Sequence, residues 1–98
     1  MALQGKRILV HGRVQGVGFR YFAQEVGTRL GLKGDARNCW DCTVEIFVEG
    51  SSEVLLDFIR EVEKGPPLSR VTRVEVQDIP ATRRYRSFTV EGMWPCNI

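Results

Sequence analysis

A glycine-rich stretch that ends in an arginine is the part of this chain best suited to chemistry. It runs from Gly12 to Arg20 with the sequence GRVQGVGFR. Glycines allow backbone N–H groups to converge without Cβ clashes, and the free N–H groups at a helix start favour negative charge. Arg20 adds a planar, permanently charged guanidinium group that can bind two phosphate oxygens at once. The stretch therefore predicts a site for a phosphate-type anion.

A plainer explanation is a strand-to-helix connection whose glycines only form tight turns. The glycine spacing matches neither the dinucleotide-binding pattern nor the Walker pattern, so spacing alone does not decide between the two explanations. Arg20 favours the anion site. A positive charge in the first turn of a helix opposes the helix dipole, and this placement is easier to understand if an anion binds beside it.

The flanking segments position this loop between a strand and a helix. Apolar residues within Lys6–His11 predict a strand before the loop. After the loop, Phe22, Val26 and Leu30 recur at helical spacing and predict a helix over Arg20–Leu30. The loop thus leads directly into the amino terminus of a helix.

The rest of the chain continues this alternation of strands and helices. Thr43–Glu49 alternates apolar with more polar residues and gives the clearest strand. An apolar stripe from Val54 to Val62 predicts a second helix, with Ser51 or Ser52 as its cap. The further expected elements are a weak strand over Lys33–Asn38, a hairpin turn over Cys39–Cys42, a strand over Arg70–Ile79, a short strand over Tyr85–Glu91 and a tail from Met93 without a predicted structure.

The order of these elements is β-α-β-β-α-β, followed by an extra strand. This order predicts the α+β class, as a sandwich of a mainly antiparallel sheet with two helices on one face. Ninety-eight residues suit one compact domain, so we expect residues 1–98 to form a single domain.

The composition excludes several classes of protein. Hydrophobic residues make up 43% and charged residues 27% of the chain, as in an ordinary globular domain. The formal net charge of +2 is too small to indicate nucleic acid, and no apolar run approaches a membrane span. The first residues lack a signal-peptide core, and three cysteines do not make a secreted disulfide framework. We therefore expect a cytoplasmic monomer whose partner is an anionic small molecule, not nucleic acid or a membrane.

The stretch Gly12–Arg20 resembles the signature sequence of the acylphosphatase family. Asn38, Asp41, Val44 and Gly50 resemble that family's second motif, and the similarity covers nearly the whole chain. The resemblance implies a ferredoxin-like β-α-β-β-α-β fold. It also implies hydrolysis of the carboxyl–phosphate bond of acyl phosphates to a carboxylate and inorganic phosphate. Neither a histidine–carboxylate cluster nor a complete set of cysteines points to a metal, so we expect no metal and no cofactor.

The resemblance further implies the roles of the site residues. Arg20 would bind the phosphoryl oxygens and Asn38 would orient the attacking water, although asparagine is also a common turn residue. A substrate oxygen could take the proton of the water, which agrees with the lack of an evident protein base. His11, the only histidine, lies on the preceding strand and is expected to be structural. The backbone N–H groups that bind phosphate would come from Gln15, Gly16, Val17, Gly18 and Phe19.

Two residues depart from the usual second motif of the family. Asp35 stands where family members usually carry an aromatic residue, and Cys42 stands where they usually carry a glycine. A non-glycine residue costs about 1–2 kcal/mol at a position that needs positive φ. We therefore expect the hairpin that carries Asn38 to differ in shape.

Three other functions compete with this prediction. The chain could be an acylphosphatase-like domain that acts on carbamoyl phosphate, as in hydrogenase-maturation carbamoyltransferases. Cys39 and Cys42 form a C-x-x-C pair typical of a metal-carrier module, but the pair fills only half of a tetrahedral zinc site. The basic cluster Arg83–Arg86 suggests RNA binding, which Glu45 and Glu49 on the clearest strand disfavour.

The redox state of the three cysteines is left open by the sequence. If Trp40 and Asp41 form a two-residue turn, Cys39 and Cys42 oppose each other with Cα atoms about 5.5 Å apart, which suits a disulfide. Such a bridge would tether the backbone next to Asn38 and change kcat more than phosphate binding. Reduced cysteines are the expectation for a cytoplasmic protein, and this bridge is the alternative.

Overall fold

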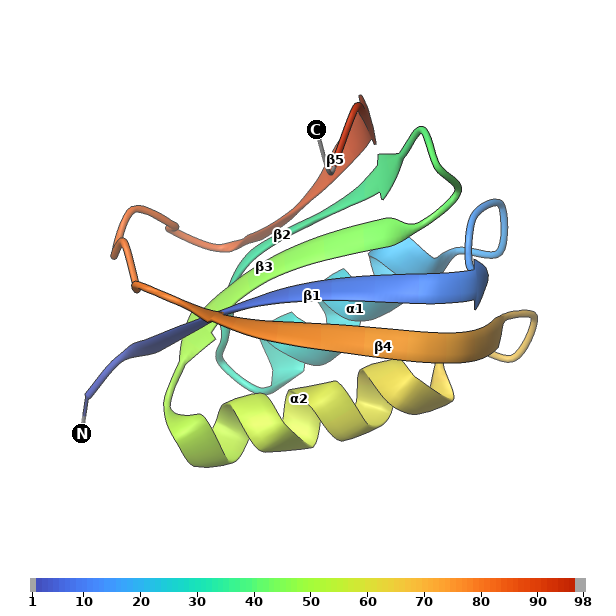
Figure 1. Ribbon diagram of the computed structural model, residues 1–98. Coiled ribbons are helices and arrows are strands. Elements are labelled where there is room, and N and C mark those ends of the chain that lie inside the picture. Colours follow the sequence, from blue (N-terminus) through green and yellow to red (C-terminus); the bar gives the residue numbers. More distant parts are fainter. Residues whose placement is uncertain (1, 97–98) are drawn as a thin grey trace.

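The computed structural model describes residues 2–96 as five strands and two helices (Figure 1). The elements are β1 (Gln4–Arg13), α1 (Phe19–Arg29), β2 (Lys33–Cys39), β3 (Val44–Gly50), α2 (Ser52–Lys64), β4 (Arg70–Ile79) and β5 (Phe88–Trp94). The strands form one sheet in the order β4-β1-β3-β2-β5, and among these strands only β2 and β5 pair in parallel. Both helices cover one face of the sheet (Figure 1). The expected α+β, ferredoxin-like fold is confirmed.

The core lies between the sheet and the two helices. Side chains alternate between the two faces of a strand, so every second residue of β1 and β3 points toward the helices. Each helix turns its apolar stripe to the same layer. The buried residues of this layer include Ile8, Val10, Val44, Ile46 and Val48 from the sheet, Phe19, Ala23 and Val26 from α1, and Leu55, Phe58 and Val62 from α2.

Gly27 allows α1 to approach β5 closely. A Cβ atom at this position would overlap the ring of Phe88 on β5. A glycine inside a helix costs about 1 kcal/mol relative to alanine, but here a larger residue would push the helix away from the sheet. This contact holds the last strand next to the helix that begins at the glycine-rich loop.

The strand directions bring the carboxyl ends of β1 and β2 to the same end of the sheet. Both strands are antiparallel to β3, which lies between them, so β1 and β2 run in the same direction. The loop after β1 and the hairpin after β2 therefore lie at the same end of the molecule (Figure 1). This topology places the glycine-rich loop near Asn38.

The predicted bounds of the last strand were wrong, and the predicted cap of α2 was right in its position only. The last strand begins at Phe88 instead of Tyr85 and continues to Trp94, because its bounds are set by parallel pairing with β2, which a local pattern does not show. Ser51 occupies the N-cap of α2, but its side chain forms no capping hydrogen bond.

Residues 1 and 97–98, at the two ends of the chain, lie outside the described residues. Within the described chain, neither helix is long and apolar enough to cross a membrane.

Candidate active site

The loop after β1 combines buried anchors with exposed glycines. Val14 and Phe19 are buried, and Val17 packs against the core. Gly16 and Gly18 are exposed and have φ angles of 73° and 78°. Such angles favour glycine because the left-handed region is costly for residues with a side chain. The apolar anchors fix the loop, while the backbone between them stays accessible.

The amino terminus of α1 carries no competing negative charge. Gly18 is the N-cap residue, so no side chain caps the helix, and its first turn contains no acidic residue. The first N–H groups of a helix lack partners within the helix and favour an anion. The local sequence thus leaves this terminus suited to a phosphate group.

Gln15 ties the loop to the β2–β3 hairpin. Its Nε2 donates hydrogen bonds to the carbonyl oxygens of Cys39, at 2.7 Å, and of Thr43, at 2.9 Å. Cys39 directly follows Asn38, so this brace holds the two sequence motifs in a fixed relation. Since the side-chain amide is used in the brace, the backbone N–H of Gln15 is the group left for a phosphate cradle.

Arg20 extends from the first turn of α1 to β5. Its Nη1 donates a hydrogen bond to the carbonyl oxygen of Glu91. Among residues 2–96, no carboxylate forms an ion pair with Arg20. One side of the guanidinium group is therefore oriented by the backbone, while its charge has no anionic partner in the part of the chain that the structure describes. This arrangement suits an arginine that binds an anion.

Asn38 lies near the end of β2 on the side that faces the helices. It pairs with the buried Val44 of β3 and with Met93 of β5, and it is 9% exposed. No hydrogen bond joins its amide to another of residues 2–96. Its amide atoms are not among the fully buried, unpartnered polar atoms of this part of the chain, and an amide can both donate and accept hydrogen bonds, so this amide can bind a water molecule.

Comparisons with known proteins agree with this geometry. A family model for acylphosphatase matches residues 6–90. An acylphosphatase of Koribacter versatilis is 46% identical over 89 residues, which are 91% of this chain and 81% of the relative. One of Bacillus pumilus is 43% identical over 84 residues, 86% of this chain and 93% of the relative. The chain belongs to the acylphosphatase family.

Solved acylphosphatase structures share the fold. The crystal structure of acylphosphatase from Bacillus subtilis has a TM-score of 0.86 at 39% identity, over 92% of this chain and 99% of that chain. A domain of full-length HypF matches equally well, with a TM-score of 0.87 at 32% identity, but the match covers only 12% of that protein. Family membership confirms the expected function: this chain is an enzyme that hydrolyses acyl phosphates.

The turn that carries the second acylphosphatase motif contains three residues, not two. The N–H of Cys39 donates to the carbonyl oxygen of Thr43 at 2.9 Å, so these two residues close the hairpin. Asp41 accepts hydrogen bonds from the backbone N–H of Thr43, at 3.2 Å, and from its hydroxyl group, at 2.5 Å. Cys42 ends the turn with a φ of 75°. Three-residue hairpin loops commonly place a left-handed residue last, so the positive φ suspected at Cys42 is confirmed.

The expectation of three reduced cysteines and the alternative of a Cys39–Cys42 bridge are both wrong. Cys39 forms a disulfide with Cys96, with Cα atoms 5.2 Å apart, and Cys42 is a free, exposed thiol. The extra residue in the turn explains the error, because Cys42 does not lie opposite Cys39. The metal-carrier alternative loses its ligand pair for the same reason. Glu45 places an oxygen within 4.8 Å of the bonded sulfurs, but it pairs with Arg7 at 2.6 Å.

His11 has a partner on the neighbouring strand. Its Nε2 lies 2.5 Å from the Oε2 atom of Glu75 on β4. This hydrogen bond lowers the pKa of Glu75. The contact agrees with the structural role expected for the histidine.

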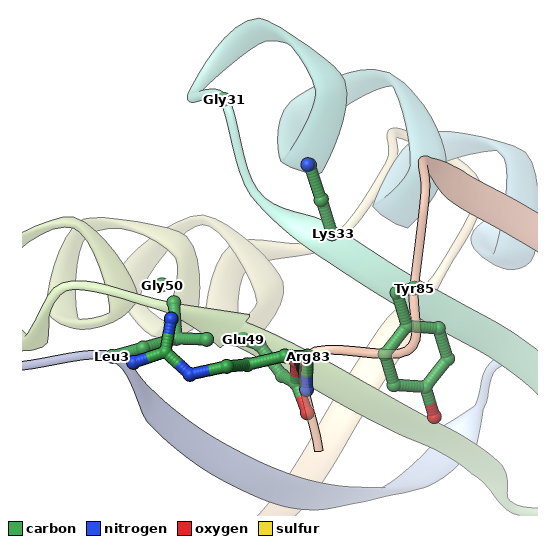
Figure 2. A pocket seen from close by; sticks show the side chains of 7 residues that line it. All are labelled: Leu3, Gly31, Lys33, Glu49, Gly50, Arg83 and Tyr85. Atoms are coloured by element: carbon green, nitrogen blue, oxygen red, sulfur yellow. Dashed lines mark hydrogen bonds between the residues drawn. The ribbon is translucent and has the colours of Figure 1, made fainter. Parts of the chain in front are cut away.

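A cavity of about 260 Å³ lies away from the glycine-rich loop (Figure 2). It is found where β2 begins and β3 ends, and it contains none of the predicted site residues. Figure 2 shows Lys33 and Arg83 extending from different segments with their cationic groups apart. The cavity therefore lacks the convergent charge that a phosphate site needs. Its lining residues are Leu3, Gly31, Lys33, Glu49, Gly50, Arg83 and Tyr85.

Several contacts of the site could not be predicted from the sequence. The carbonyl oxygens of Thr43 and Glu91 hold Gln15 and Arg20, and backbone carbonyls carry no residue-type signal. Cys96 reaches β2 only because β5 pairs with that strand. The odd number of cysteines was the one available signal, and it did not indicate a pairing.

Proposed function

We propose that the loop Gln15–Arg20 binds the phosphoryl group of an acyl phosphate and that Asn38 orients the water that attacks it. The brace formed by Gln15 carries this proposal, because its hydrogen bonds to the carbonyl groups of Cys39 and Thr43 join the anion loop to the strand end that bears Asn38. Loop N–H groups and the Arg20 guanidinium would bind the phosphoryl oxygens. Phosphoryl transfer needs mainly this positioning and charge stabilisation.

The proposed reaction breaks the bond between phosphorus and the carboxylate oxygen. Water held by Asn38 attacks phosphorus, the carboxylate departs with the bonding electron pair, and a phosphoryl oxygen takes the proton of the water. The products are a carboxylate and inorganic phosphate. A carboxylate is a good leaving group and needs no general acid, which agrees with the small set of ionisable residues around the loop.

The wider context belongs to the same proposal. Residues 1–98 are taken as one acylphosphatase domain that works as a cytoplasmic monomer on a free small molecule, without nucleic acid, membrane, metal or cofactor. The match to a small part of HypF makes a role inside a larger protein the second candidate. The preferred acyl group separates the two, since the second candidate acts on carbamoyl phosphate.

A substrate panel in isotopically labelled water tests the proposal. Benzoyl phosphate, acetyl phosphate and carbamoyl phosphate would be compared with p-nitrophenyl phosphate, a phosphomonoester whose leaving group is poorer. We expect rapid hydrolysis of the acyl phosphates, slow or no hydrolysis of the ester, and ¹⁸O from water only in the phosphate. Label in the carboxylate would mean attack at the carbonyl carbon and would overturn the assigned roles. A strong preference for carbamoyl phosphate would favour the second candidate.

A further inference from the structure

The segment Glu91–Cys96 lies outside the residues that match the family model, yet it contacts both proposed catalytic residues. The family match ends at residue 90. The strand β5 continues beyond this point along the end of β2, which carries Asn38. The family-model match therefore stops within β5 and does not cover the residues of this segment.

Arg20 is held by the first residue of the segment. The carbonyl oxygen of Glu91 accepts a hydrogen bond from Nη1 of Arg20. A side chain as long as arginine loses much rotamer freedom when one end is fixed. The position of the Glu91 backbone thus sets where the remaining guanidinium N–H groups point.

Asn38 is flanked by the middle of the segment. The register between β2 and β5 shifts after Ala36, so that Asn38 pairs with Met93 and Cys39 with Trp94. The carbonyl oxygen of Trp94 then accepts a hydrogen bond from the N–H of Trp40, at 3.0 Å. The backbone on both sides of Asn38 is therefore bound to β5.

Two interactions on the other face fix the end of the segment. The Trp94 ring lies under the guanidinium group of Arg37, 4.7 Å from its Cζ atom. Cys96 is bonded to Cys39, the residue next to Asn38. The stacking is non-covalent and partly exposed, so the disulfide is the one contact that cannot open by thermal motion.

We propose that the Cys39–Cys96 disulfide clasps Glu91–Cys96 against Arg20 and Asn38 and positions both side chains, so that hydrolysis depends on the redox state of this pair. The inference rests on the roles proposed for Arg20 and Asn38. Cys39 and Cys96 act here as positioning residues, since neither needs to touch the substrate. Misplacement of a catalytic group by about 1 Å can lower a rate by about 100-fold.

The redox step is ordinary thiol–disulfide exchange. A dithiol reductant attacks the sulfur of Cys96, which is only partly buried, whereas Cys39 is fully buried. The second thiol of the reductant then attacks the mixed disulfide, and the reductant leaves as a cyclic disulfide. Two electrons and two protons are transferred to the sulfurs of Cys39 and Cys96. A small-molecule disulfide reverses the step.

The test compares oxidised and reduced enzyme in a Cys42→Ser background, which removes the one free thiol that could exchange with the bridge. For each state, kcat with benzoyl phosphate and the inhibition constant of inorganic phosphate are measured at a low temperature where circular dichroism shows folded protein. We expect reduction to lower kcat about tenfold or more, because the amide and the guanidinium lose their fixed positions. Phosphate binding should change by a smaller factor, since the loop N–H groups stay in place.

Reoxidation and a serine variant complete the experiment. Reoxidation should restore kcat. The kcat of the Cys42→Ser/Cys96→Ser variant should equal that of the reduced enzyme and should not change when the reductant is added. An active oxidised enzyme whose kcat is unchanged by reduction overturns the inference and leaves the proposed function intact. Equal changes in kcat and phosphate inhibition, or loss of the native spectrum on reduction, also overturn it, because the bond would then act on the fold as a whole. An inactive oxidised enzyme would instead count against the proposed function.

Discussion

At the scale of single residues, Arg20 combines a fixed position with a charge that has no anionic partner among residues 2–96. Its hydrogen bond to the Glu91 carbonyl uses one guanidinium nitrogen. The other guanidinium N–H groups form no ion pair with a carboxylate among residues 2–96. Lysine could supply the charge but neither the fork nor its orientation. The residue type is therefore as important as the charge.

Replacement of Arg20 should almost abolish activity. Removing one preorganised donor from a transition state typically lowers kcat by about 10²–10³, so Arg20→Ala should lose at least this much and Arg20→Lys should not rescue it. Arg29→Ala is the matched control, because it removes the same side chain from the exposed last turn of the same helix. Steady-state hydrolysis of benzoyl phosphate measures the effect. Equal activity in the Arg20→Ala and Arg29→Ala enzymes would remove Arg20 from the mechanism.

Replacement of Asn38 should separate catalysis from binding. Asn38→Ala should lower kcat sharply while inorganic phosphate still inhibits competitively, because the amide is expected to hold water and not phosphate. Gln24→Ala is a useful control, since Gln24 also contributes a side-chain amide, bonded to the Phe88 carbonyl at 3.0 Å and outside the site. A parallel loss of phosphate inhibition and kcat in Asn38→Ala would contradict the division of roles.

Asp35 gives the stability of the fold a pH dependence. Burial raises the pKa of this carboxyl group, and Arg37, at 3.0 Å, only partly opposes the effect. Burial and the nearby Asp35 charge raise the pKa of Tyr85 to about 12, and Glu91 adds a further negative charge near Asp35. Since the folded-state pKa of Asp35 is raised, its contribution to stability is greatest at low pH and is lost as the pH rises through that value.

Asp35→Asn should therefore gain stability relative to the wild type as the pH rises from about 4 to about 7. Urea unfolding at several pH values measures this difference in the free energy of unfolding. Asp57→Asn is the control, because that side chain is 60% exposed on α2 and should show little pH-dependent difference. A difference that is flat with pH, or that favours the wild type at pH 7, would show that the ion pair with Arg37 outweighs burial.

At the scale of elements, the β2–β3 hairpin shows what a local sequence pattern predicts and what it misses. The alternation of Val44, Ile46 and Val48 predicted β3 correctly, because one face of that strand is buried against the helices. The turn length was not predictable from the local sequence. The pairing of Cys39 with Thr43 sets it at three residues instead of two. The same limit applies to β5, whose bounds follow from its partner β2.

The left-handed conformation of Cys42 should make Cys42→Gly stabilising. A non-glycine residue in this region costs about 1–2 kcal/mol, and glycine gives back part of this through the greater entropy of the unfolded chain, so the expected gain is about 1 kcal/mol. Urea unfolding under fixed redox conditions measures the change. Cys42→Ala also removes the thiol but keeps the Cβ atom and should not be stabilised. If the two variants gain equally, the backbone conformation is not the cause.

At the scale of the whole molecule, the chain order and the hydrophobic pattern predicted the fold, and the topology explains the site. The strands β1 and β2 run in the same direction on either side of β3 and therefore finish at the same end of the sheet. The glycine-rich loop and Asn38 lie close together there. Composition could not predict which cysteines pair, since three thiols allow three pairings. Only the parallel contact of β5 with β2 brings Cys96 to Cys39.

The disulfide should contribute a large part of the stability of the molecule. It joins positions 57 residues apart, and the loss of chain entropy in the unfolded state for such a loop corresponds to about 4 kcal/mol. A domain of this size has a total stability of only about 5–15 kcal/mol. Reduction should thus lower the urea midpoint of unfolding strongly without changing the folded spectrum at low urea, because the two helices and the pairing of β1, β3 and β4 do not depend on the bond. The measurement is made in Cys42→Ser protein to prevent exchange during unfolding. Identical unfolding curves with and without reductant would mean that Cys39 and Cys96 are not bonded in solution, and the clasp would then lose its physical basis.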